Sequence, residues 1–408
     1  MFSNKRLIVG IIALVAVTSV VSVLGSALVF SGLDYLNPKY EISFDPKAVS
    51  IENIRKFVQV RDVLKSEYYK TVDENNLVEG AISGMADSLG DPYTMYFNKE
   101  QMKVFMERSD GSYVGIGVSI TMGNDGLLTI IEPFKGSPAE KAGMLQGDKI
   151  IRVGDKDVTA IRDEDIIISM IKGPENTGVK VTVYRPSEGK PIEFDMVRKR
   201  IKVENIRSEV LPGNIGYIRI IMFDSDISRY FEEHLNALLG QGIDALVIDV
   251  RDNPGGSYDQ VVKIADRLLP KGLIVYTEDR RGKKVEEFSD PKQLELPMAV
   301  LVNDNSASAS EILSGALKDH NKATLVGVKT FGKGLVQAVL PLSDGSGLKV
   351  TVSRYFTPSG VCIQDIGIEP NQTVQLPEKY NNMPVSQIPR GDDVQLQTAV
   401  EILKAKKQ

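Results

Sequence analysis

The chain has 408 residues, a formal net charge of -5 and 42% hydrophobic residues. This length exceeds one ordinary hydrophobic core and indicates two or three domains. The acidic balance argues against nucleic acid as a partner, because phosphates require a basic surface. With 1 cysteine and 2 histidines, no intramolecular disulfide can form, and neither a zinc site nor a thiol nucleophile is expected. We therefore expect no metal and no cofactor.

Residues 1–36 carry the features of a membrane anchor. Lys5 and Arg6 precede an uncharged stretch from Leu7 to Phe30, and a helix needs about 20 apolar residues to cross a bilayer. The positive residues predict a cytoplasmic N-terminus. A cleaved signal peptide is the alternative, although its apolar region usually has only about 7–15 residues. We expect a single-pass protein of the cell membrane whose remaining chain lies outside the cytoplasm.

Residues 37–110 follow as a linker and a small helical domain. Two apolar stripes have the spacing of a helix face. A glycine and a proline around Asp91 end the second helix, since proline disfavours the helical conformation of its predecessor. Such stripes usually belong to a core, and pairing of two chains as a homodimer is the alternative. The stripes consist of Phe57, Val60, Leu64 and Tyr68, and of Val78, Ile82, Met85 and Leu89.

Residues 111–200 change to short strands and turns, with two short helices. The predicted strands span 114–120, 127–131, 149–153 and 179–184, and the helices begin near Ser137 and Asp163. This order, with Tyr113 to Gly117 in front and Ala142 to Ile150 in the middle, resembles a PDZ domain.

The PDZ resemblance implies a binding site for the C-terminal end of a peptide. The peptide would add as a strand beside Gly117 to Ile120, with its carboxylate held by backbone amides of the preceding loop. Glycine permits the dihedral angles that turn consecutive N–H groups inward. The alternative is that Gly115 and Gly117 only shape a turn. The expected peptide-binding residues are Tyr113, Val114, Gly115, Ile116, Gly117 and Val118.

Residues 201–377 alternate strands with helices, which predicts a layered α/β core. Two apolar runs, 335–342 and 348–355, flank a glycine-rich turn and predict a β-hairpin extension. Residues 378–408 are loop-like until an amphipathic helix at 394–404. The predicted strands of the core span 215–220, 245–250 and 298–302, and its helices span 228–239, 258–269 and 310–318.

Three segments of this core have the composition of a site. The first, Asp249 to Gly256, is a strand that ends in a polar turn with paired glycines, and such turns at strand ends are where α/β folds place sites. A tight strand-to-helix connection is the plain alternative. The second, Asn303 to Glu311, brings serines to a helix start, where unsatisfied N–H groups favour an oxyanion. Those serines could equally be N-caps.

The third segment, Lys329 to Gln337, offers a base. A serine nucleophile needs a group that takes its proton, and the chain has almost no histidine. A lysine can serve only when burial favours its neutral form. Lys333 is flanked by glycines and followed by an apolar strand, although taken alone it is more typical of a surface lysine.

Together the three segments resemble those of the carboxyl-terminal processing peptidases. The similarity runs from about Val58 to Leu403 and includes Leu89 to Thr94, the PDZ domain and Tyr355 to Gly360. The resemblance implies a crotonase-like protease core and a serine endopeptidase without a metal. It places the nucleophile at Ser308, its general base at Lys333 and an assisting glutamine at Gln337. It also implies an oxyanion hole formed by Gly255 or Gly256 and by the amide of Ala309. Glu311 and Asp319 match acidic positions of unsettled role.

The implied mechanism is acyl transfer on protein substrates whose accessible C-termini bind the PDZ domain. If Lys333 to Gln337 were fully extended, about 13 Å would separate the two side chains. We therefore expect the backbone to bend at Gly334. Peptide capture by the PDZ domain could also control access to Ser308.

Three other readings remain. A membrane-anchored PDZ scaffold without activity would tolerate loss of Ser308 and Lys333. An acyl-CoA enzyme would use a similar oxyanion hole but would need no PDZ domain. A Ser-His-Asp hydrolase would have to use His320, which lies near the far end of the predicted helix that begins at Ser310.

Overall fold

The computed structural model describes residues 50–123, 125–380 and 383–407. The predicted anchor at 7–30 and the linker at 37–49 lie outside these residues. Within the described ranges, no helix combines the length and the apolar character that a bilayer crossing needs.

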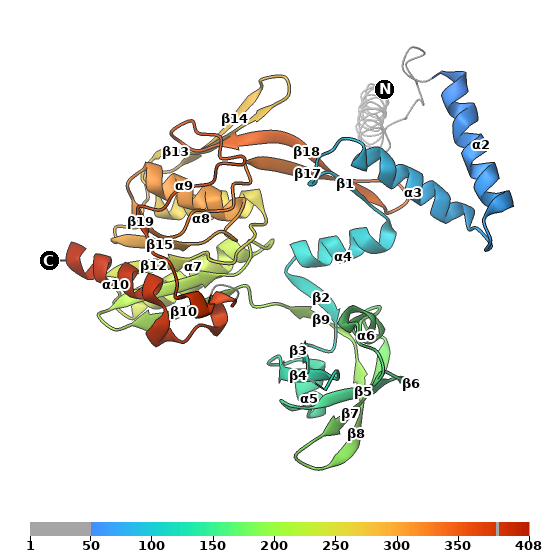
Figure 1. The fold of residues 1–408 in the computed structure, drawn as a ribbon. Helices are drawn as coiled ribbons and strands as arrows, with labels where there is room; N and C mark the ends of the chain where they lie inside the picture. The colour runs from blue at the N-terminus through green and yellow to red at the C-terminus, as the bar shows by residue number, and fades with distance from the viewer. Residues whose placement is uncertain (1–49, 124, 381–382, 408) are drawn as a thin grey trace, which may run out of the picture.

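A six-stranded sheet forms the centre of the layered core that the sequence predicts for residues 201–377 (Figure 1). Its order is β10-β11-β12-β15-β16-β19, with β10 antiparallel to β11 and all other neighbours parallel. Every residue of β12 and β15 is buried, as in parallel strands covered on both faces. The strands are β10 (Ile206–Leu211), β11 (Ile215–Ile220), β12 (Ala245–Asp249), β15 (Met298–Val302), β16 (Ala323–Gly327) and β19 (Gln372–Thr373).

Helices cover both faces of this sheet. Leu246 and Ile248 of β12 pack in one cluster with residues of α7 (Ile227–Gly240), α8 (Tyr258–Leu268) and α9 (Ala309–Asp319). Ala245 and Val247 pack in another cluster with apolar residues of α10 (Val394–Lys406). Since successive side chains of a strand point to opposite faces, the core is a three-layer α/β/α structure.

A second sheet extends from the core and contains the hairpin predicted at 335–355 (Figure 1). Its order is β1-β18-β13-β14, and β17 pairs with β18 in antiparallel register. The β13–β14 hairpin was not predicted. The strands are β1 (Met95–Phe97), β13 (Gly272–Asp279), β14 (Lys284–Ser289), β17 (Leu335–Pro341) and β18 (Gly347–Phe356).

The PDZ unit has its own sheet and its own hydrophobic core. A two-stranded ribbon of β2 and β9 connects it to the rest of the molecule (Figure 1). The predicted strand at 114–120 is interrupted at Ile116 and Gly117. The elements are β2 (Ser112–Gly115), β3 (Val118–Met122), β4 (Leu128–Pro133), α5 (Pro138–Ala142), β5 (Lys149–Val153), β6 (Lys156–Asp157), α6 (Glu164–Ile171), β7 (Gly178–Arg185), β8 (Lys190–Val197) and β9 (Lys199–Lys202).

The N-terminal helices are α2 (Ile51–Glu67), α3 (Glu74–Asp87) and α4 (Lys99–Ser109). The expectation that their apolar stripes form a core is wrong for α2, which has no buried residue. Phe57 and Tyr68 are 55% and 52% exposed. The physical reason is that α2 projects away from the core and the PDZ unit (Figure 1). The stripe of α3 is only partly covered, and Met85 is 73% exposed.

Candidate active site

The three segments predicted to carry chemistry meet at one edge of the central sheet. They follow β12, β15 and β16, which are parallel neighbours in register. Because the carboxyl ends of parallel strands lie at the same edge, the turns after these strands come together. Ser306 Oγ donates to Val250 O at 2.7 Å, and Ser310 Oγ donates to Asn253 O at 2.9 Å. Two serines of the run therefore tie the second segment to the first.

Ser308 differs from these two serines in exposure and in backbone conformation. Ser306 and Ser310 are fully buried, whereas Ser308 is partly exposed and lines a cavity. Its φ is 55°, a left-handed conformation that is strained for a non-glycine residue and recurs at functional sites. Ser308 is also the N-cap residue of α9, and the amide of Ala309, the first residue of this helix, has no acceptor among the described residues.

The buried Glu311 carboxylate connects the second segment to the third. Its two oxygens accept four hydrogen bonds of 2.6 to 2.9 Å, from Ser308 N, Thr330 Oγ1, Gly332 N and Lys333 N. Hydrogen bonds to a carboxylate are about twice as strong as bonds between neutral groups. Glu311 thus fixes the backbone of Ser308 relative to that of Lys333.

Tyr355 makes a second link between the same two residues. Its hydroxyl lies 2.6 Å from Lys333 O and 3.1 Å from Ser308 O. Burial raises the pKa of Tyr355 well above its ordinary value, and Glu311 raises it further. The phenol therefore stays protonated and can donate to these carbonyls.

Two backbone amides beside Ser308 are free to bind an anion. Within the described residues, the N–H groups of Gly256 and Ala309 donate no hydrogen bond. The N–H of Gly255 instead donates to Asn253 Oδ1 at 2.9 Å. A Cβ atom on Gly255 would lie 2.8 Å from Ser308 Cβ, so only glycine permits this close approach.

Lys333 is partly buried beside this turn. Its Nζ lies 4.7 Å from the centroid of the Tyr93 ring, and in the described structure it makes no hydrogen bond or salt bridge. Burial lowers the pKa of Lys333 below its ordinary value, and Lys349 lowers it further, while Asp91 and Glu311 act in the opposite direction. The neutral form is therefore more accessible than in a solvated lysine.

Gln337 lies on β17, four residues beyond Lys333. Its Nε2 donates to Thr351 Oγ1 at 3.4 Å. The pairing of β17 with β18 shifts register here, because Val336 faces Ser353 and Gln337 faces Thr351. The extra residue, Val352, lies on β18, and a bulge of this kind bends the strand that carries it. Gly334, where the bend is predicted, lies just before the start of β17.

One cavity of about 580 Å³ brings all the predicted core residues together. Much of its remaining wall is apolar and includes Met222, Phe223 and Ile312. An extended peptide with an apolar side chain suits such a wall. The predicted residues that line the cavity are Gly255, Gly256, Ser308, Ala309, Lys333 and Gln337.

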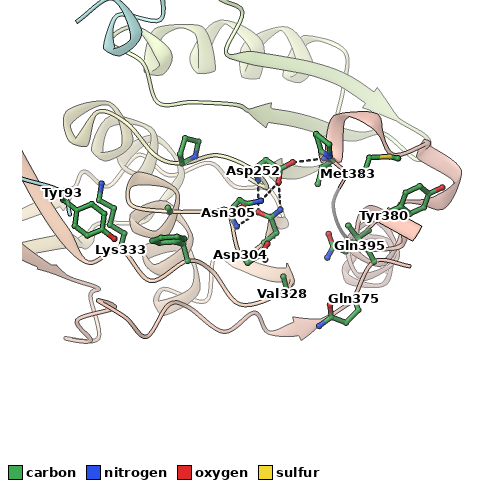
Figure 2. A pocket seen from close by; sticks show the side chains of 17 residues that line it. Tyr93, Asp252, Asp304, Asn305, Val328, Lys333, Gln375, Tyr380, Met383 and Gln395 are labelled. Atoms are coloured by element: carbon green, nitrogen blue, oxygen red, sulfur yellow. Dashed lines mark hydrogen bonds between the residues drawn. The ribbon is translucent and has the colours of Figure 1, made fainter. Parts of the chain in front are cut away.

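A larger cavity of about 1150 Å³ shares Lys333 with the first one (Figure 2). Lys333 and Tyr93 lie together at one end, and Tyr380 and Gln395 of the C-terminal segment lie at the other. Asp252 occupies the middle, where its carboxylate accepts hydrogen bonds from Asn303, Asn305 and the Val385 amide. Within the described residues, no group of acidic, histidine or cysteine side chains could hold a metal ion.

The predicted peptide-binding loop lies where β2 leads into β3. β3 is an edge strand of the PDZ sheet, which leaves one side open for an added strand. Tyr113, Val114 and Gly115 belong to β2, Ile116 is buried in the PDZ core, and Val118 begins β3. Gly117 has a φ of 78° and would clash with Ser137 if it carried a Cβ.

The other candidates from the sequence lie away from Ser308. His320 is the C-cap of α9, and its ring nitrogen lies 2.7 Å from Leu273 O. Asp319 accepts a hydrogen bond from Ser359 N. Both residues lie at the opposite end of an 11-residue helix, roughly 16 Å from its start. A Ser-His-Asp arrangement with His320 is therefore excluded.

Sequence reasoning missed Tyr93, Tyr355 and the four-bond role of Glu311. Tyr93 and Tyr355 are far in sequence from Ser308, and only the pairing of β1 and β17 with β18 brings their segments to the cavity. The resemblance did include both motifs, Leu89 to Thr94 and Tyr355 to Gly360, and the motifs were the available signal.

Family comparisons divide the chain into three matched segments. Residues 214–374 match Peptidase family S41. Residues 103–184 match the PDZ domain. Residues 23–101 match the family described as Activating protease CtpB N-terminal domain.

Similar proteins carry related names. A "Carboxy-terminal-processing protease" of Bartonella bacilliformis is 36% identical over 345 residues, which cover 82% of this chain and 78% of that protein. A "Probable CtpA-like serine protease" of Staphylococcus aureus is 38% identical over 338 residues, covering 82% of this chain and 67% of that protein. A solved Bacteroides fragilis structure whose name assigns it to the S41 proteases has a TM-score of 0.53 at 17% identity, over 85% of this chain and 97% of its own.

Proposed function

This chain belongs to the carboxyl-terminal processing peptidases of family S41, and from that membership we propose that Ser308 and Lys333 form its catalytic pair. The chain is a serine-type protease with a PDZ domain. The observation that carries the proposal is that Ser308 and the partly buried Lys333, which has no salt-bridge partner among the described residues, line the same cavity.

In the proposed acylation step, neutral Lys333 takes the proton of the Ser308 hydroxyl. Ser308 Oγ attacks the peptide carbonyl, and the oxyanion is held by the free N–H groups of Gly256 and Ala309. Each donor contributes about 3 kcal/mol to such stabilisation. The Gly255 amide is already bonded to Asn253, so Gly256 is the better candidate for the hole.

The proton then moves from the Lys333 ammonium to the leaving amine, and water later releases the acyl group. Gln337 donates its Nε2 to Thr351. In the proposal, its carbonyl oxygen accepts from the Lys333 ammonium that forms during acylation and holds the base near Ser308. The three serines of the run divide their roles, because Ser306 and Ser310 already donate to backbone carbonyls.

The test compares full-length wild-type chain with Ser308→Ala and Lys333→Ala on fluorescently labelled casein. We expect each variant to lose at least about 1000-fold in kcat/KM. Lys329→Ala is the matched control, because Lys329 lies four residues earlier and pairs with Glu369 at the surface. Equal proteolysis by all four proteins would reject the catalytic pair and favour the PDZ scaffold.

We further propose that the PDZ domain selects substrates by their C-terminal tails. The open edge of β3 would pair with the tail, and the amides of residues 114–118 would bind its carboxylate. Control of access to Ser308 by this capture is part of the proposal, and its support is the domain order.

A deletion can test the PDZ proposal because its ends are close. Val203 N donates to Gly111 O at 2.8 Å, so a short glycine-serine linker can replace residues 112–202. We expect the deleted protein to lose its preference for a substrate with a free C-terminal tail over one with an amidated tail. An unchanged preference would contradict the proposal.

The membrane anchor and the extracytoplasmic position are proposals that rest on residues 5–30 of the sequence. Extraction of cell membranes at alkaline pH tests them. An anchored protein stays in the membrane pellet, whereas a protein released by signal cleavage does not.

A further inference from the structure

In the described structure, the Lys333 ammonium makes no hydrogen bond or salt bridge, and it lies over the ring of Tyr93. The Nζ lies 4.7 Å from the ring centroid, within the range of a cation–π interaction. Figure 2 shows Tyr93 and Lys333 side by side at the end of the larger cavity. The Tyr93 hydroxyl makes no hydrogen bond to any described residue. The side chain therefore contacts Lys333 through its ring face and not through its hydroxyl.

The loop that carries Tyr93 is held rigidly against the catalytic strands. The Asp91 carboxylate accepts hydrogen bonds from Tyr93 N at 3.0 Å and from Thr94 Oγ1 at 2.6 Å. Thr94 Oγ1 in turn accepts from Thr351 N at 3.0 Å. Thr351 also accepts from Gln337 Nε2. The position of the ring is thereby set by the same strand that positions the proposed assisting glutamine.

Several charged groups surround this contact. Asp91, Glu311 and Lys349 face Lys333, and Asp365 faces Tyr93. Glu311 already accepts four hydrogen bonds, and Asp91 is bonded within its own loop. Neither carboxylate forms a salt bridge with the Lys333 ammonium. The π face of Tyr93 is therefore the group placed to receive the charge.

We propose that Tyr93 is a positioning residue for the catalytic base, and that its ring face holds the ammonium which Lys333 becomes when it takes the Ser308 proton. This inference rests on the proposed function. The proton leaves Ser308 Oγ, resides on Lys333 Nζ over the ring, and passes to the nitrogen of the leaving amine. Tyr93 forms no bond and exchanges no proton.

The test measures kcat and KM against pH for the full-length wild-type chain, Tyr93→Phe and Tyr93→Leu, with labelled casein. Phenylalanine keeps the ring face, so its pH profile should match that of the wild type. Leucine removes the face, and we expect kcat on the high-pH plateau to fall about 3- to 30-fold with little change in KM. Without the ring the ammonium is less stable, so the acidic limb should move about 0.5 to 1 unit to lower pH.

Tyr69→Leu is the matched control. Lys70 Nζ lies 5.0 Å from the Tyr69 ring centroid, and Tyr69 is 77% exposed on the N-terminal helical unit. This variant should keep the wild-type profile. Thermal unfolding checks each protein, and Tyr93→Met, which is apolar and flexible, replaces Tyr93→Leu if the leucine variant does not fold.

Three outcomes would overturn the inference. The first is a Tyr93→Leu or Tyr93→Met variant whose kcat plateau and acidic limb match those of the wild type. The second is a fall in kcat with no movement of the acidic limb. The third is a fall in kcat that also occurs in Tyr93→Phe. The activity of Ser308→Ala shows whether such an outcome removes the role of Tyr93 alone or the proposed function as well. If Ser308→Ala is inactive, a wild-type profile in Tyr93→Leu removes only the role of Tyr93, whereas an active Ser308→Ala removes the catalytic pair itself.

Discussion

At the scale of single residues, the structure separates side chains that the sequence treats alike. Ser306, Ser308 and Ser310 are interchangeable in a pattern of small residues, and the resemblance alone favoured the middle one. The structure buries the outer two against carbonyls of the first segment and leaves Ser308 at the cavity. Periodicity could not predict this division, because it depends on a turn from another strand.

Glu311 leads to the first prediction. In Glu311→Gln, one of the two acceptor oxygens becomes an NH₂ group, which is a donor and faces the N–H or O–H donors that the oxygen served. Because at least one buried donor then lacks a partner, we expect the free energy of unfolding to fall by about 2 to 4 kcal/mol, with at least a tenfold loss of kcat. Urea denaturation followed by circular dichroism measures the first quantity.

A surface glutamate provides the control for this prediction. Glu233→Gln removes a charge that pairs with Arg229 on the exposed face of α7, and such a pair contributes about 0 to 1 kcal/mol. If Glu311→Gln were as stable and as active as Glu233→Gln, the four hydrogen bonds would have no role in fixing Ser308 relative to Lys333.

At the scale of elements, the sequence predicted the parts that have strong periodicity. The strand at 298–302 and the helix at 258–269 were placed to within a residue or two. β13 and β14 were missed because β14 and the end of β13 carry charged residues and most of β14 is exposed. The meeting of the three segments followed from parallel strand order, but the contacts of the loop at 91–94 depend on β1 pairing with β18, which no local pattern indicates.

Arg251 gives a prediction at this scale, because it joins the end of β12 to the start of α10. The guanidinium is fully buried and contacts the carboxylates of Asp249 and Asp393 and the amide of Gln395. Burial alone would raise the pKa of Asp249, but Arg251 lowers it overall. The Asp249 carboxylate therefore remains charged inside the protein.

Arg251→Met leaves these two buried carboxylates without their counter-charge. We expect the free energy of unfolding to fall by about 3 to 5 kcal/mol, with faster hydrogen exchange in α10. Arg229→Met removes an exposed guanidinium and should change stability by less than about 1 kcal/mol. Equal stability of the two variants would mean that the buried cluster does not hold α10 on the sheet.

At the scale of the whole molecule, the sequence predicted the layered core and the PDZ fold but not the exposure of α2. The stripe with helical period is real, yet Phe57, Val60 and Leu64 are 55%, 53% and 40% exposed. Periodicity reports that one face of a helix is apolar and does not report what covers it. A second copy of the chain is the covering that we propose.

The prediction for this face concerns oligomeric state. The full-length chain in detergent should sediment as a dimer, because burial of apolar side chains favours association. The double variant Phe57→Glu and Val60→Glu places charges on the stripe and should sediment as a monomer. A monomeric wild-type protein, or a double variant that remains dimeric, would contradict the homodimer.

The most direct test of the central claim follows labelling of Ser308 by a fluorophosphonate, measured by intact mass against pH. Because burial and Lys349 lower the pKa of Lys333, the neutral base appears below the ordinary lysine value of 10.5. The wild-type labelling rate should rise with pH through that depressed pKa and level off. Lys333→Ala should label slowly without this rise. The same labelling rate and pH profile in both proteins would contradict the account.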